Sequence, residues 1–563
     1  MSSRQFPSLI ILPVLAGIAA CAGAPDAFVA GGDAFDGGAS SVGRQGMVSS
    51  AHPLATEAGL SILRRGGNAF DAAVAIASTL NVVEPMMSGM GGYGTILAFD
   101  AEAGEAHYLD ASGKIPRAVD ADLYRAPTPG YMENRRNAKA ISTPGAANAW
   151  EAMSERFGVL PWESLFEPAI DAAQGGFVLD ERAAGWIALA YPEFPAHARE
   201  FYGKDGVPLA AGDRLIQVDL AGSLRAVAEQ GAAAVYSGAI SRAIDRAMQE
   251  SGGFLSAHDL AADRAEWWRP ISIDYRGYEV ITPSAPAGAF PMLVRLGMME
   301  LEDNQALGHN SVAYLHRFAE VTKHAYWTRL AYSGDPDVKP PPYERLFSAR
   351  YLAEQEAKLN LEKASEFDTS GIVSANQNKN TTHFVVADEH GNVVSATVTL
   401  GNLFGSRVMP AGTGIWLNNS LAYCTFEPAG NPMDAHPGRR KLSSDSPTFV
   451  MRDGRPWVAL GTPGGHTITQ TCAQMVMNVI DFGMDIQAAI AAPRIAFNVP
   501  DHLDVEEAIP EATRTTLEAM GHRLRLRTLG NAHGLMIEYG EDGVPRRFLG
   551  GTDPRGTGTA VGY

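Results

Sequence analysis

The chain has 563 residues, of which 46% are hydrophobic, so it can bury a substantial core and global disorder is excluded. The formal net charge is −18 at pH 7, and no basic stripe offsets it, which excludes a nucleic-acid partner. This charge balance is common in soluble secreted proteins, so it says little about the charge of a substrate.

The N-terminus has the pattern of an export signal. Residues 9–20 are apolar but too short to span a bilayer, and they end in Ile-Ala-Ala-Cys at Cys21. This resembles a bacterial lipoprotein processing site. We predict a signal peptide at 1–21, lipidation of Cys21, a flexible tether at 22–42, and an exported protein in the periplasm or at the cell surface. Membrane contact would then occur only through the lipid anchor. The alternative is an ordinary signal peptide cut near residues 22–24.

The mature fold is predicted to start near Gly46, with a helix over 54–63 and a second helix capped by Asn68. A glycine-rich stretch, Ser88–Gly94, then precedes a predicted strand at 95–99. Because these glycines precede a strand and do not open a helix, a phosphate-binding loop is disfavoured. Close backbone packing explains them better.

The middle of the chain is mostly helical in pattern. The helices are expected over 146–157, 163–174, 223–229 and 316–331, and two strands over 271–275 and 278–282. His309, His316 and His324 lack the spacing of a ligand cluster, so we predict no metal, and no glycine-rich loop indicates another cofactor. Cys424 and Cys472 are interpreted as buried small residues, and whether they pair stays open.

The central stretch of the sequence is Asn380–Asp388. A polar run, 374–380, leads into a predicted hairpin with strands at 384–386 and 393–400. If the chain is cut before Thr381, that residue gains a free α-amine with a pKa of about 7.7–8.0 beside its own hydroxyl. One residue would then supply both a nucleophile and its base. The alternative, a surface loop that enters an ordinary hairpin, is common for such residues.

Three motifs follow one another in the second half: Thr-Thr-His at 381–383, Leu-Ser-Ser-Asp-Ser-Pro at 442–447, and Gly-Thr-Pro-Gly-Gly at 461–465. In this order they resemble the γ-glutamyltransferase (γ-glutamyltranspeptidase) family of N-terminal nucleophile (Ntn) hydrolases. The resemblance implies an α+β fold, a four-layer αββα sandwich. It also implies one heterodimeric unit formed by autocleavage of a precursor into a large subunit, 43–380, and a small subunit, 381–563.

The resemblance also implies roles for single residues. Thr381 would be the nucleophile, released by cleavage of the Asn380–Thr381 bond, and Thr399 would orient it. The donors to the oxyanion would be Gly464 and Gly465, whose adjacent amides near a helix start suit an anion. A plain strand-to-helix turn is the alternative for this pair. The residues that hold the substrate's α-carboxylate would be Ser443 and Ser444.

The departures from the family concern the acyl pocket. Ser112 stands where the family has an arginine that clamps the glutamyl carboxylate. The positions that bind the α-amino group in the family hold Gly401, Ser420 and Tyr423. Losing these contacts should cost several kcal/mol of discrimination, because charge-assisted hydrogen bonds are each worth roughly 1.5–3 kcal/mol. The candidates for replacement contacts are Arg407, Lys114, Arg117, Arg440 and Asn402; surface positions are the alternative for each.

We therefore expect an autoprocessed amidohydrolase or acyltransferase that acts on a small-molecule amide through an acyl-threonine intermediate, with a non-standard acyl pocket. Its partners would be that amide or γ-glutamyl-like substrate and its own cleaved subunit. Cephalosporin acylases and oxamate amidohydrolase resemble the family while acting on other amides. Two alternatives stay open: a true γ-glutamyltransferase or glutathione hydrolase with a rebuilt pocket, and a lipid-anchored binding protein without turnover.

Overall fold

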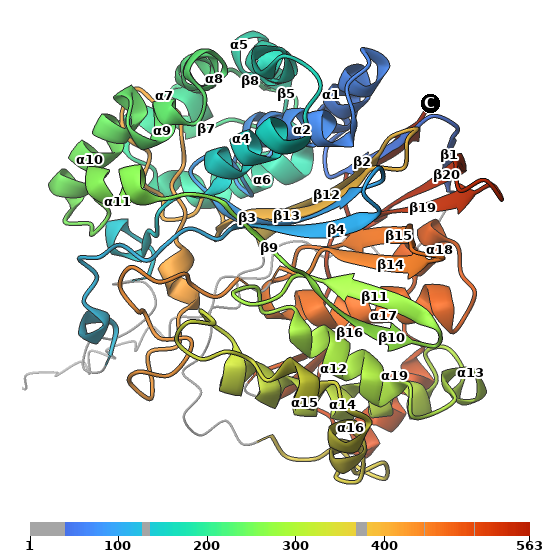
Figure 1. The fold of residues 1–563 in the computed structure, drawn as a ribbon. Coiled ribbons are helices and arrows are strands. Elements are labelled where there is room, and N and C mark those ends of the chain that lie inside the picture. Colours follow the sequence, from blue (N-terminus) through green and yellow to red (C-terminus); the bar gives the residue numbers. More distant parts are fainter. Residues whose placement is uncertain (1–39, 126–134, 368–379, 444, 500) are drawn as a thin grey trace, which may run out of the picture. The chain divides into compact units, whose positions relative to one another are not determined.

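Two seven-stranded antiparallel sheets stack face to face at the centre of the structure, a computed structural model, and helices cover both outer faces (Figure 1). The structure describes residues 40–125, 135–367, 380–443, 445–499 and 501–563. This is the αββα sandwich predicted from the sequence. The predicted processing site at Cys21 lies outside the described residues.

Both sheets combine strands from before and after Thr381. The first sheet has the order β21 (Thr559–Gly562), β2 (Met47–Ser50), β12 (Asn380–Ala387), β13 (Val393–Gly401), β3 (Tyr93–Asp100), β4 (Glu105–Ala111), β9 (Glu266–Trp268). The second has the order β1 (Ser41–Gly43), β20 (Pro545–Thr552), β19 (His533–Tyr539), β15 (Arg455–Gly461), β14 (Thr448–Arg452), β11 (Tyr278–Thr282), β10 (Ile271–Tyr275). A cut before Thr381 would therefore leave two fragments that share both sheets.

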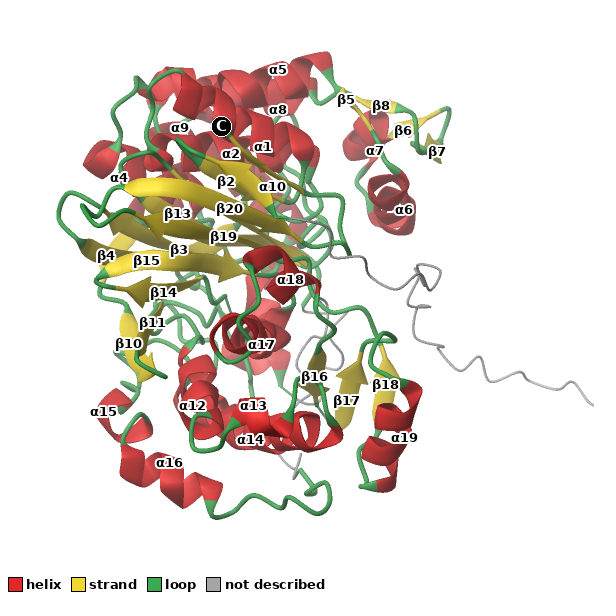
Figure 2. Cartoon of the chain, turned by 90° about the vertical axis from the view of Figure 1, so that its right-hand side faces the viewer, coloured by secondary structure: helices red, strands yellow, loops and turns green. Residues whose placement is uncertain are grey.

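Different helices cover the two sheets, as Figures 1 and 2 show. Those packed on or beyond the first sheet are α1 (Pro53–Arg64), α2 (Ala69–Val83), α4 (Ala146–Phe157), α5 (Glu167–Gly175), α6 (Glu181–Ala190), α8 (Val218–Gln230), α9 (Ala233–Tyr236) and α10 (Ala239–Ser251). Those on the second sheet's side are α12 (Phe290–Met299), α14 (Val312–Tyr332), α16 (Ala349–Glu356), α17 (Ile468–Ile480), α18 (Ile486–Ala491) and α19 (Glu511–Ala519). A small sheet of β16 (Ile495–Asn498), β17 (His502–Val505) and β18 (Leu524–Leu526) lies beside the second group.

The alternation of side chains along β12 decides where the site lies. Phe384 and Val386 pack in the core between the first sheet and its helices, whereas Val385 and Ala387 pack in the core between the two sheets. Successive side chains of a strand point to opposite faces. His383, which precedes Val385 by two residues, therefore faces the space between the sheets.

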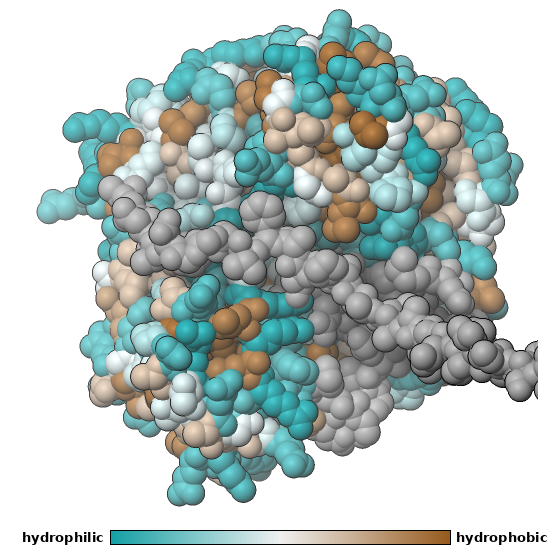
Figure 3. All heavy atoms as spheres, turned by 180° about the vertical axis from the view of Figure 1, so that it is seen from behind, coloured by the Kyte–Doolittle hydropathy of each residue, from teal (hydrophilic) through white to brown (hydrophobic). Residues whose placement is uncertain are grey.

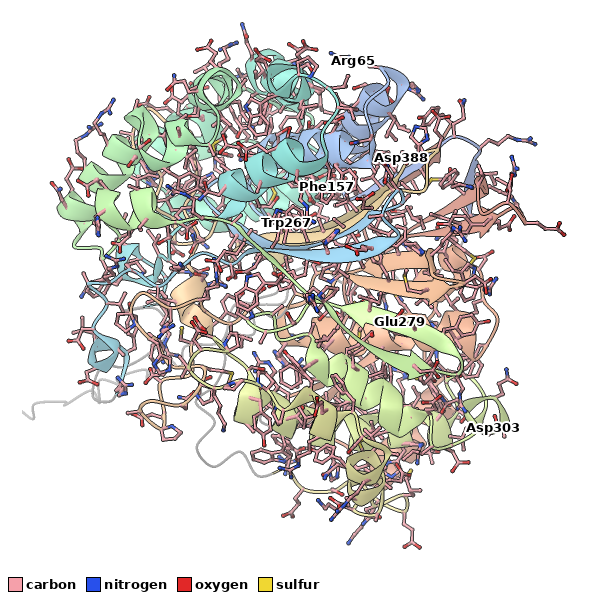
Figure 4. All side chains as sticks on the ribbon, viewed as in Figure 1. Arg65, Phe157, Trp267, Glu279, Asp303 and Asp388 are labelled. Carbon is pink, nitrogen blue, oxygen red and sulfur yellow. The ribbon has the colours of Figure 1, made fainter. Side chains whose placement is uncertain are left out.

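The β12–β13 hairpin is fixed to the first residues of α2 by Asp388, which Figure 4 labels. The Asp388 carboxylate accepts hydrogen bonds from the backbone N–H of Ala69 at 2.9 Å and of Asn392 at 3.0 Å. The predicted cap Asn68 is confirmed, since it forms a reciprocal capping box with Asp71. The hairpin turn and α2 thus fix the position of β12, and with it the position of Thr381.

Two of the differences between the structure and the sequence prediction have a clear local cause. The predicted helix over 163–174 is a 3-10 turn, Trp162–Phe166, followed by α5, because Pro168 occupies the first turn of α5 and opens a new helix there. β1 begins at Ser41, inside the predicted tether 22–42, because it pairs with β20. Both Cys424 and Cys472 are buried free thiols, as interpreted from the sequence.

The surface shows no extended apolar area on the face in Figure 3, where hydrophobic residues form small separate patches outside the grey atoms. Exposed apolar side chains such as Val159 and Leu189 are scattered along the chain, and isolated examples are normal on soluble domains. Of the described helices, none is long and apolar enough to cross a membrane.

Candidate active site

Thr381 lies at an irregularity of the hairpin. Asn380 pairs with Gly401 and Thr382 pairs with Val398, so two residues of β13, Thr399 and Leu400, lie opposite Thr381. The N–H of Leu400 leaves the ladder and donates to the carbonyl of Met87 at 2.7 Å. This is a β-bulge, a feature that re-aims side chains and is over-represented beside active sites.

At the bulge, two threonine hydroxyl groups form a hydrogen-bonded chain that ends at the carbonyl of the peptide bond before Thr381. Thr381 Oγ1 donates to Thr399 Oγ1 at 3.1 Å, and Thr399 Oγ1 donates to the carbonyl oxygen of Asn380 at 2.7 Å. The N–H of Gly401 donates to Thr399 Oγ1 at 2.8 Å and holds that oxygen in place. The carbonyl of the predicted scissile bond is therefore polarised by the residue that also contacts the predicted nucleophile.

The glycine-rich stretch supports this geometry by close backbone packing, as predicted. A Cβ atom at Gly92 would overlap the carbonyl oxygen of Thr399, and one at Gly91 would overlap that of Trp416. Tyr93, the next residue, is directly opposite Thr399 on the neighbouring strands β3 and β13. The stretch thus sets the distance between the backbone that leads into β3 and the Thr399 backbone.

His383 is a structural neighbour of the site. Its Nδ1 lies 2.9 Å from Thr397 Oγ1 and its Nε2 lies 3.4 Å from Ser395 Oγ. Burial, with a smaller contribution from nearby His533, holds the pKa of His383 well below its ordinary value. The ring is therefore neutral at physiological pH and orders the strand pair.

Sequence reasoning missed Glu84, which follows α2. Thr382 Oγ1 donates to Glu84 Oε2 at 2.7 Å, on the helix side of β12. Burial raises the pKa of the Glu84 carboxyl. No motif marks this residue, but an acidic residue at the end of an apolar helix is a signal that a partner is needed.

The Gly464–Gly465 pair connects β15 to the 3-10 turn that leads into α17. Their φ angles are 146° and 60°, a region that favours glycine. In the described part of the chain neither N–H donates to a protein acceptor. The backbone of Gly461, three residues earlier, lies against the ring of His383, so the pair follows at the same end of the sandwich as Thr381. This geometry suits the oxyanion role that the family resemblance implies.

Ser443 is engaged within the protein. Its hydroxyl donates to the carboxylate of Asp445 and accepts from Thr95 Oγ1 of β3 at 3.4 Å, a contact that joins the loop before β14 to the first sheet. Burial raises the pKa of Asp445 to about 6. The predicted contact of Ser443 with a substrate carboxylate would have to compete with Asp445, a residue that the sequence analysis overlooked. Ser444 lies outside the described residues.

Two of the predicted replacement cations are paired with carboxylates beside the site. Arg440 lies 2.8 Å from Asp110 and 2.6 Å from Glu266, and its side chain is only 3% exposed. Lys114 lies 3.5 Å from the same Glu266. Ser112, at the position of the family's arginine, donates to Asp110 at 3.0 Å. Asp110 thus binds both Arg440 and Ser112. We therefore correct the expectation that Arg440 faces a substrate.

The other candidates also have contacts within the protein. Arg407 lies 3.0 Å from Glu193 and donates to the carbonyl of Ala190 at 3.1 Å, so we correct its assignment to the substrate pocket as well. Arg117 is exposed, and its guanidinium lies 2.8 Å from a ring nitrogen of His258. Asn402 is fully buried, and its backbone N–H donates to Asn419 at 2.8 Å.

A cation that sequence reasoning missed lies at the site. The Lys441 ammonium is 3.4 Å from the centroid of the Tyr93 ring, and the residue is 2% exposed. Its hydrogen-bond acceptor is the carbonyl of Leu442 at 3.1 Å. Burial lowers the pKa of Lys441 to about 8. The available signal was a lysine directly before the motif at 442–447.

One group of possible metal ligands occurs among the described residues: His316, Glu320 and His522. The two histidines hydrogen-bond to each other at 2.8 Å, and Glu320 lies 2.8 Å from the Lys323 ammonium. A positive charge on the carboxylate opposes a metal cation. His316 and Glu320 lie in α14 and His522 lies in the loop after α19, and we interpret the group as a structural network.

A surface cavity of ≈ 390 Å³ lies at the turn between β14 and β15, lined in part by Arg452, Arg455, Trp457 and Tyr539. It is at the end of β15 opposite Gly461, which contacts His383. The cavity is therefore distant from Thr381 and does not form part of the site.

Comparison with known proteins identifies the family. Residues 55–563 match the family model described as gamma-glutamyltranspeptidase. The chain belongs to the γ-glutamyltranspeptidase family. Its relatives in the family include the glutathione hydrolase proenzyme of Escherichia coli (strain K12), 34% identical over 532 residues that cover 91% of this chain and 90% of the relative. The acylase ACY 1 proenzyme of Pseudomonas sp. (strain V22) is 37% identical over 535 residues, 92% of this chain and 94% of the relative.

A solved structure of the same fold is the cephalosporin acylase from Bacillus halodurans. It superposes with a TM-score of 0.85 at 27% identity and covers 96% of this chain and 99% of that chain. This γ-glutamyltranspeptidase family member is therefore an enzyme of the Ntn-hydrolase type. Its relatives include both glutathione hydrolases and acylases, so family membership leaves the acyl group open.

Proposed function

We propose that the chain cuts itself between Asn380 and Thr381, and that the freed Thr381 then hydrolyses a small-molecule amide through an acyl-threonine intermediate. The observation that carries the proposal is the hydroxyl chain from Thr381 through Thr399 to the Asn380 carbonyl. Such a chain joins a nucleophile to the bond it would break, which an ordinary hairpin does not require.

The cleavage step follows the direction of these hydrogen bonds. Thr381 Oγ1 attacks the carbonyl carbon of Asn380, its proton passes to Thr399 Oγ1, and the Thr399 proton passes to the Asn380 oxygen. The C–N bond then breaks, the nitrogen takes up the proton, and an ester joins Asn380 to Thr381 Oγ1. Water hydrolyses the ester, which leaves a carboxylate on Asn380 and a free α-amine on Thr381.

Turnover would use the same residue. The Thr381 α-amine accepts the hydroxyl proton while Oγ1 attacks the substrate carbonyl, and the N–H groups of Gly464 and Gly465 stabilise the oxyanion. The leaving amine departs with a proton, and the acyl group stays on Thr381 Oγ1. Water then releases the acid, or an acceptor amine takes the acyl group.

We further propose that the acyl group differs from γ-glutamyl. Ser112 cannot replace an arginine, and its hydroxyl is already donated to Asp110. Tyr423 donates to the carbonyl of Gly401 at 3.1 Å, and Ser420 hydrogen-bonds to Ser142, so neither position offers a carboxylate to an α-ammonium group. A buried ammonium group without such a partner binds poorly.

The site of action is also a proposal. The signal peptide would direct the chain to the periplasm or the cell surface, where a lipid on Cys21 would anchor it; an ordinary signal peptide cut after Cys21 would leave no anchor. Metabolic labelling with a fatty-acid analogue, compared between wild type and Cys21→Ser, tests the anchor.

The test of the function is amide hydrolysis by the purified wild type, Thr381→Ser and Thr381→Ala. We expect activity in the first two and none in Thr381→Ala, because alanine lacks the hydroxyl. Glutathione belongs in the substrate panel. A kcat/KM for glutathione above ~10⁴ M⁻¹s⁻¹ would favour a true glutathione hydrolase over an enzyme with another acyl group.

A further inference from the structure

We propose that Glu84 is a positioning residue for Thr381: through Thr382 it holds the start of the small subunit in place after the cut, and its carboxylate is the counter-charge of the new α-ammonium group. The inference rests on the proposed function, because both roles begin when the bond before Thr381 breaks. It goes further by naming a residue outside the sequence motifs that positions the nucleophile.

The first argument is position. Glu84 directly follows α2, and its carboxylate accepts the hydroxyl proton of Thr382 in β12 at 2.7 Å. Three residues later, the carbonyl of Met87 accepts the N–H of Leu400, the group that leaves the ladder at the bulge. One short segment after α2 therefore contacts both strands of the hairpin at the bulge that contains Thr381.

The second argument is the change that the cut makes. In the intact chain Thr381 is held on both sides, since Asn380 is bonded to it and pairs with Gly401 across the hairpin. After the cut Thr381 is a chain terminus, and termini are poorly ordered unless they are tied down. The hydrogen bond from Thr382 to Glu84 then fixes the residue that carries the nucleophile. The contact is therefore needed more for turnover than for the cut itself.

The third argument is charge. Among the described residues, no basic side chain lies within ion-pair distance of the Glu84 carboxylate, and its hydrogen-bond donor is a neutral hydroxyl. Burial raises the pKa of this carboxyl, and Arg182 and Asp180 act on it from farther away with opposite signs. The cut creates an ammonium group on the residue before Thr382, within about 10 Å of the carboxylate by covalent geometry. At that distance the two opposite charges stabilise each other.

The two roles predict different effects. Losing the hydrogen bond lets Thr381 move, and a misplacement of about 1 Å can slow a reaction ~10²-fold. Losing the negative charge of Glu84 makes the α-ammonium group easier to deprotonate, because an opposite charge favours the charged form. The pH midpoint of the reaction should then fall by ~0.3–1 unit, the effect of one charge about 10 Å away. The other ionisable groups around the site are the same in every variant: Lys441, Asp445, His383, Arg182 and Asp180.

The probe is p-nitrophenyl acetate, whose acyl group is too small to need a specific pocket. Thr381 Oγ1 attacks the acetyl carbonyl, the α-amine takes up the hydroxyl proton, and p-nitrophenolate leaves. The experiment measures this release at about pH 6 to 9, above the background given by uncut Thr381→Ala, and it follows precursor cleavage on a gel.

Three variants separate the roles. Thr382→Val removes the hydroxyl at nearly constant shape, Glu84→Gln keeps an oxygen acceptor without the charge, and Glu84→Ala removes both. Glu167→Gln in α5 is the matched control, because it removes a carboxylate that pairs with Arg65 and whose side chain is 59% exposed.

We expect Thr382→Val and Glu84→Ala to be acylated ~10- to 100-fold more slowly than wild type, while their precursors are cut within ~3-fold of the wild-type rate. Glu84→Gln should recover at least ~5-fold of the loss in Glu84→Ala, and its pH midpoint should lie ~0.3–1 unit below that of wild type. Glu167→Gln should keep the wild-type rate and midpoint, because solvent and salt screen an exposed charge.

The outcomes separate the two proposals. Three results would overturn the inference and leave the proposed cut intact: acylation of Thr382→Val slowed no more than its cleavage, a Glu84→Gln midpoint at or above that of wild type, or a cut wild type that the probe does not acylate. An uncut wild type overturns the proposed function and the inference with it. Because Thr382→Val and Glu84→Gln nearly preserve side-chain shape, the test stands even when Glu84→Ala does not fold.

Discussion

The hydroxyl of Thr399 receives a hydrogen bond from Thr381 at 3.1 Å across the bulge of the β12–β13 hairpin. The same oxygen donates to the carbonyl of Asn380, so Thr399 touches both the attacking atom and the bond to be cut. A residue with both contacts is expected to control the rate of cleavage.

We therefore expect Thr399→Val to slow cleavage of the precursor by about 10²–10³-fold, the usual cost of removing one donor to a developing oxyanion. The measurement is the fraction of cut chain over time on a denaturing gel. Thr397→Val is the control, because its hydroxyl contacts His383 and not the scissile bond. Equal slowing in both variants would mean that general damage to the strand, not the lost hydroxyl, is responsible.

Gly92→Ala should also impair cleavage, although Gly92 has no side chain that could contact Thr381. Its new Cβ atom would overlap the carbonyl oxygen of Thr399 and displace that residue. Gly222→Ala in α8 is the matched control, since no atom lies within 4 Å of the added Cβ. We expect normal processing there, and normal processing in Gly92→Ala would show that the backbone accommodates the methyl group.

Arg440 is predicted to be structural. Arg440→Met leaves the buried Asp110 carboxylate without its ion-pair partner, although Tyr108 and Ser112 still donate hydrogen bonds to it. The free energy of unfolding should therefore fall by about 3–5 kcal/mol, and Asp110→Asn in the same chain should recover part of the loss. The control pair Arg439–Asp337 has side chains 47% and 69% exposed. There, Arg439→Met should cost about 0–1 kcal/mol. Urea unfolding measures both, and a stable Arg440→Met that loses selectivity for anionic substrates would return Arg440 to the substrate pocket.

Much of the fold was accessible to sequence reasoning because its signals are local. The strands Ile271–Tyr275 and Tyr278–Thr282 and the helix Ala146–Phe157 have the predicted bounds, since alternation, turn chemistry and a preceding Thr-Pro-Gly mark them. The order of Thr381, Ser443 and Gly464 along the chain likewise indicated the family. These features depend on residues close together in sequence.

The pocket could not be predicted in the same way, because its contacts join distant segments. Judged by its residue type, Arg440 was a candidate substrate-binding cation, and only the fold shows that Asp110 lies beside it. Lys441 and Tyr93 are far apart in the sequence, yet the ammonium lies over the ring. Which cations pair with a carboxylate depends on the order of the strands in the sheets. The alternation of side chains along a strand does not encode that order.

The central claim is most directly tested by the intact mass of the purified mature protein, measured for wild type beside Thr381→Ala. We predict two fragments in the wild type, one ending at Asn380 and one that begins at Thr381 and ends at Tyr563, and a single chain in Thr381→Ala. An uncut wild-type chain, a cut at another bond, or the same two fragments in Thr381→Ala would contradict the assignment of Thr381 as the nucleophile.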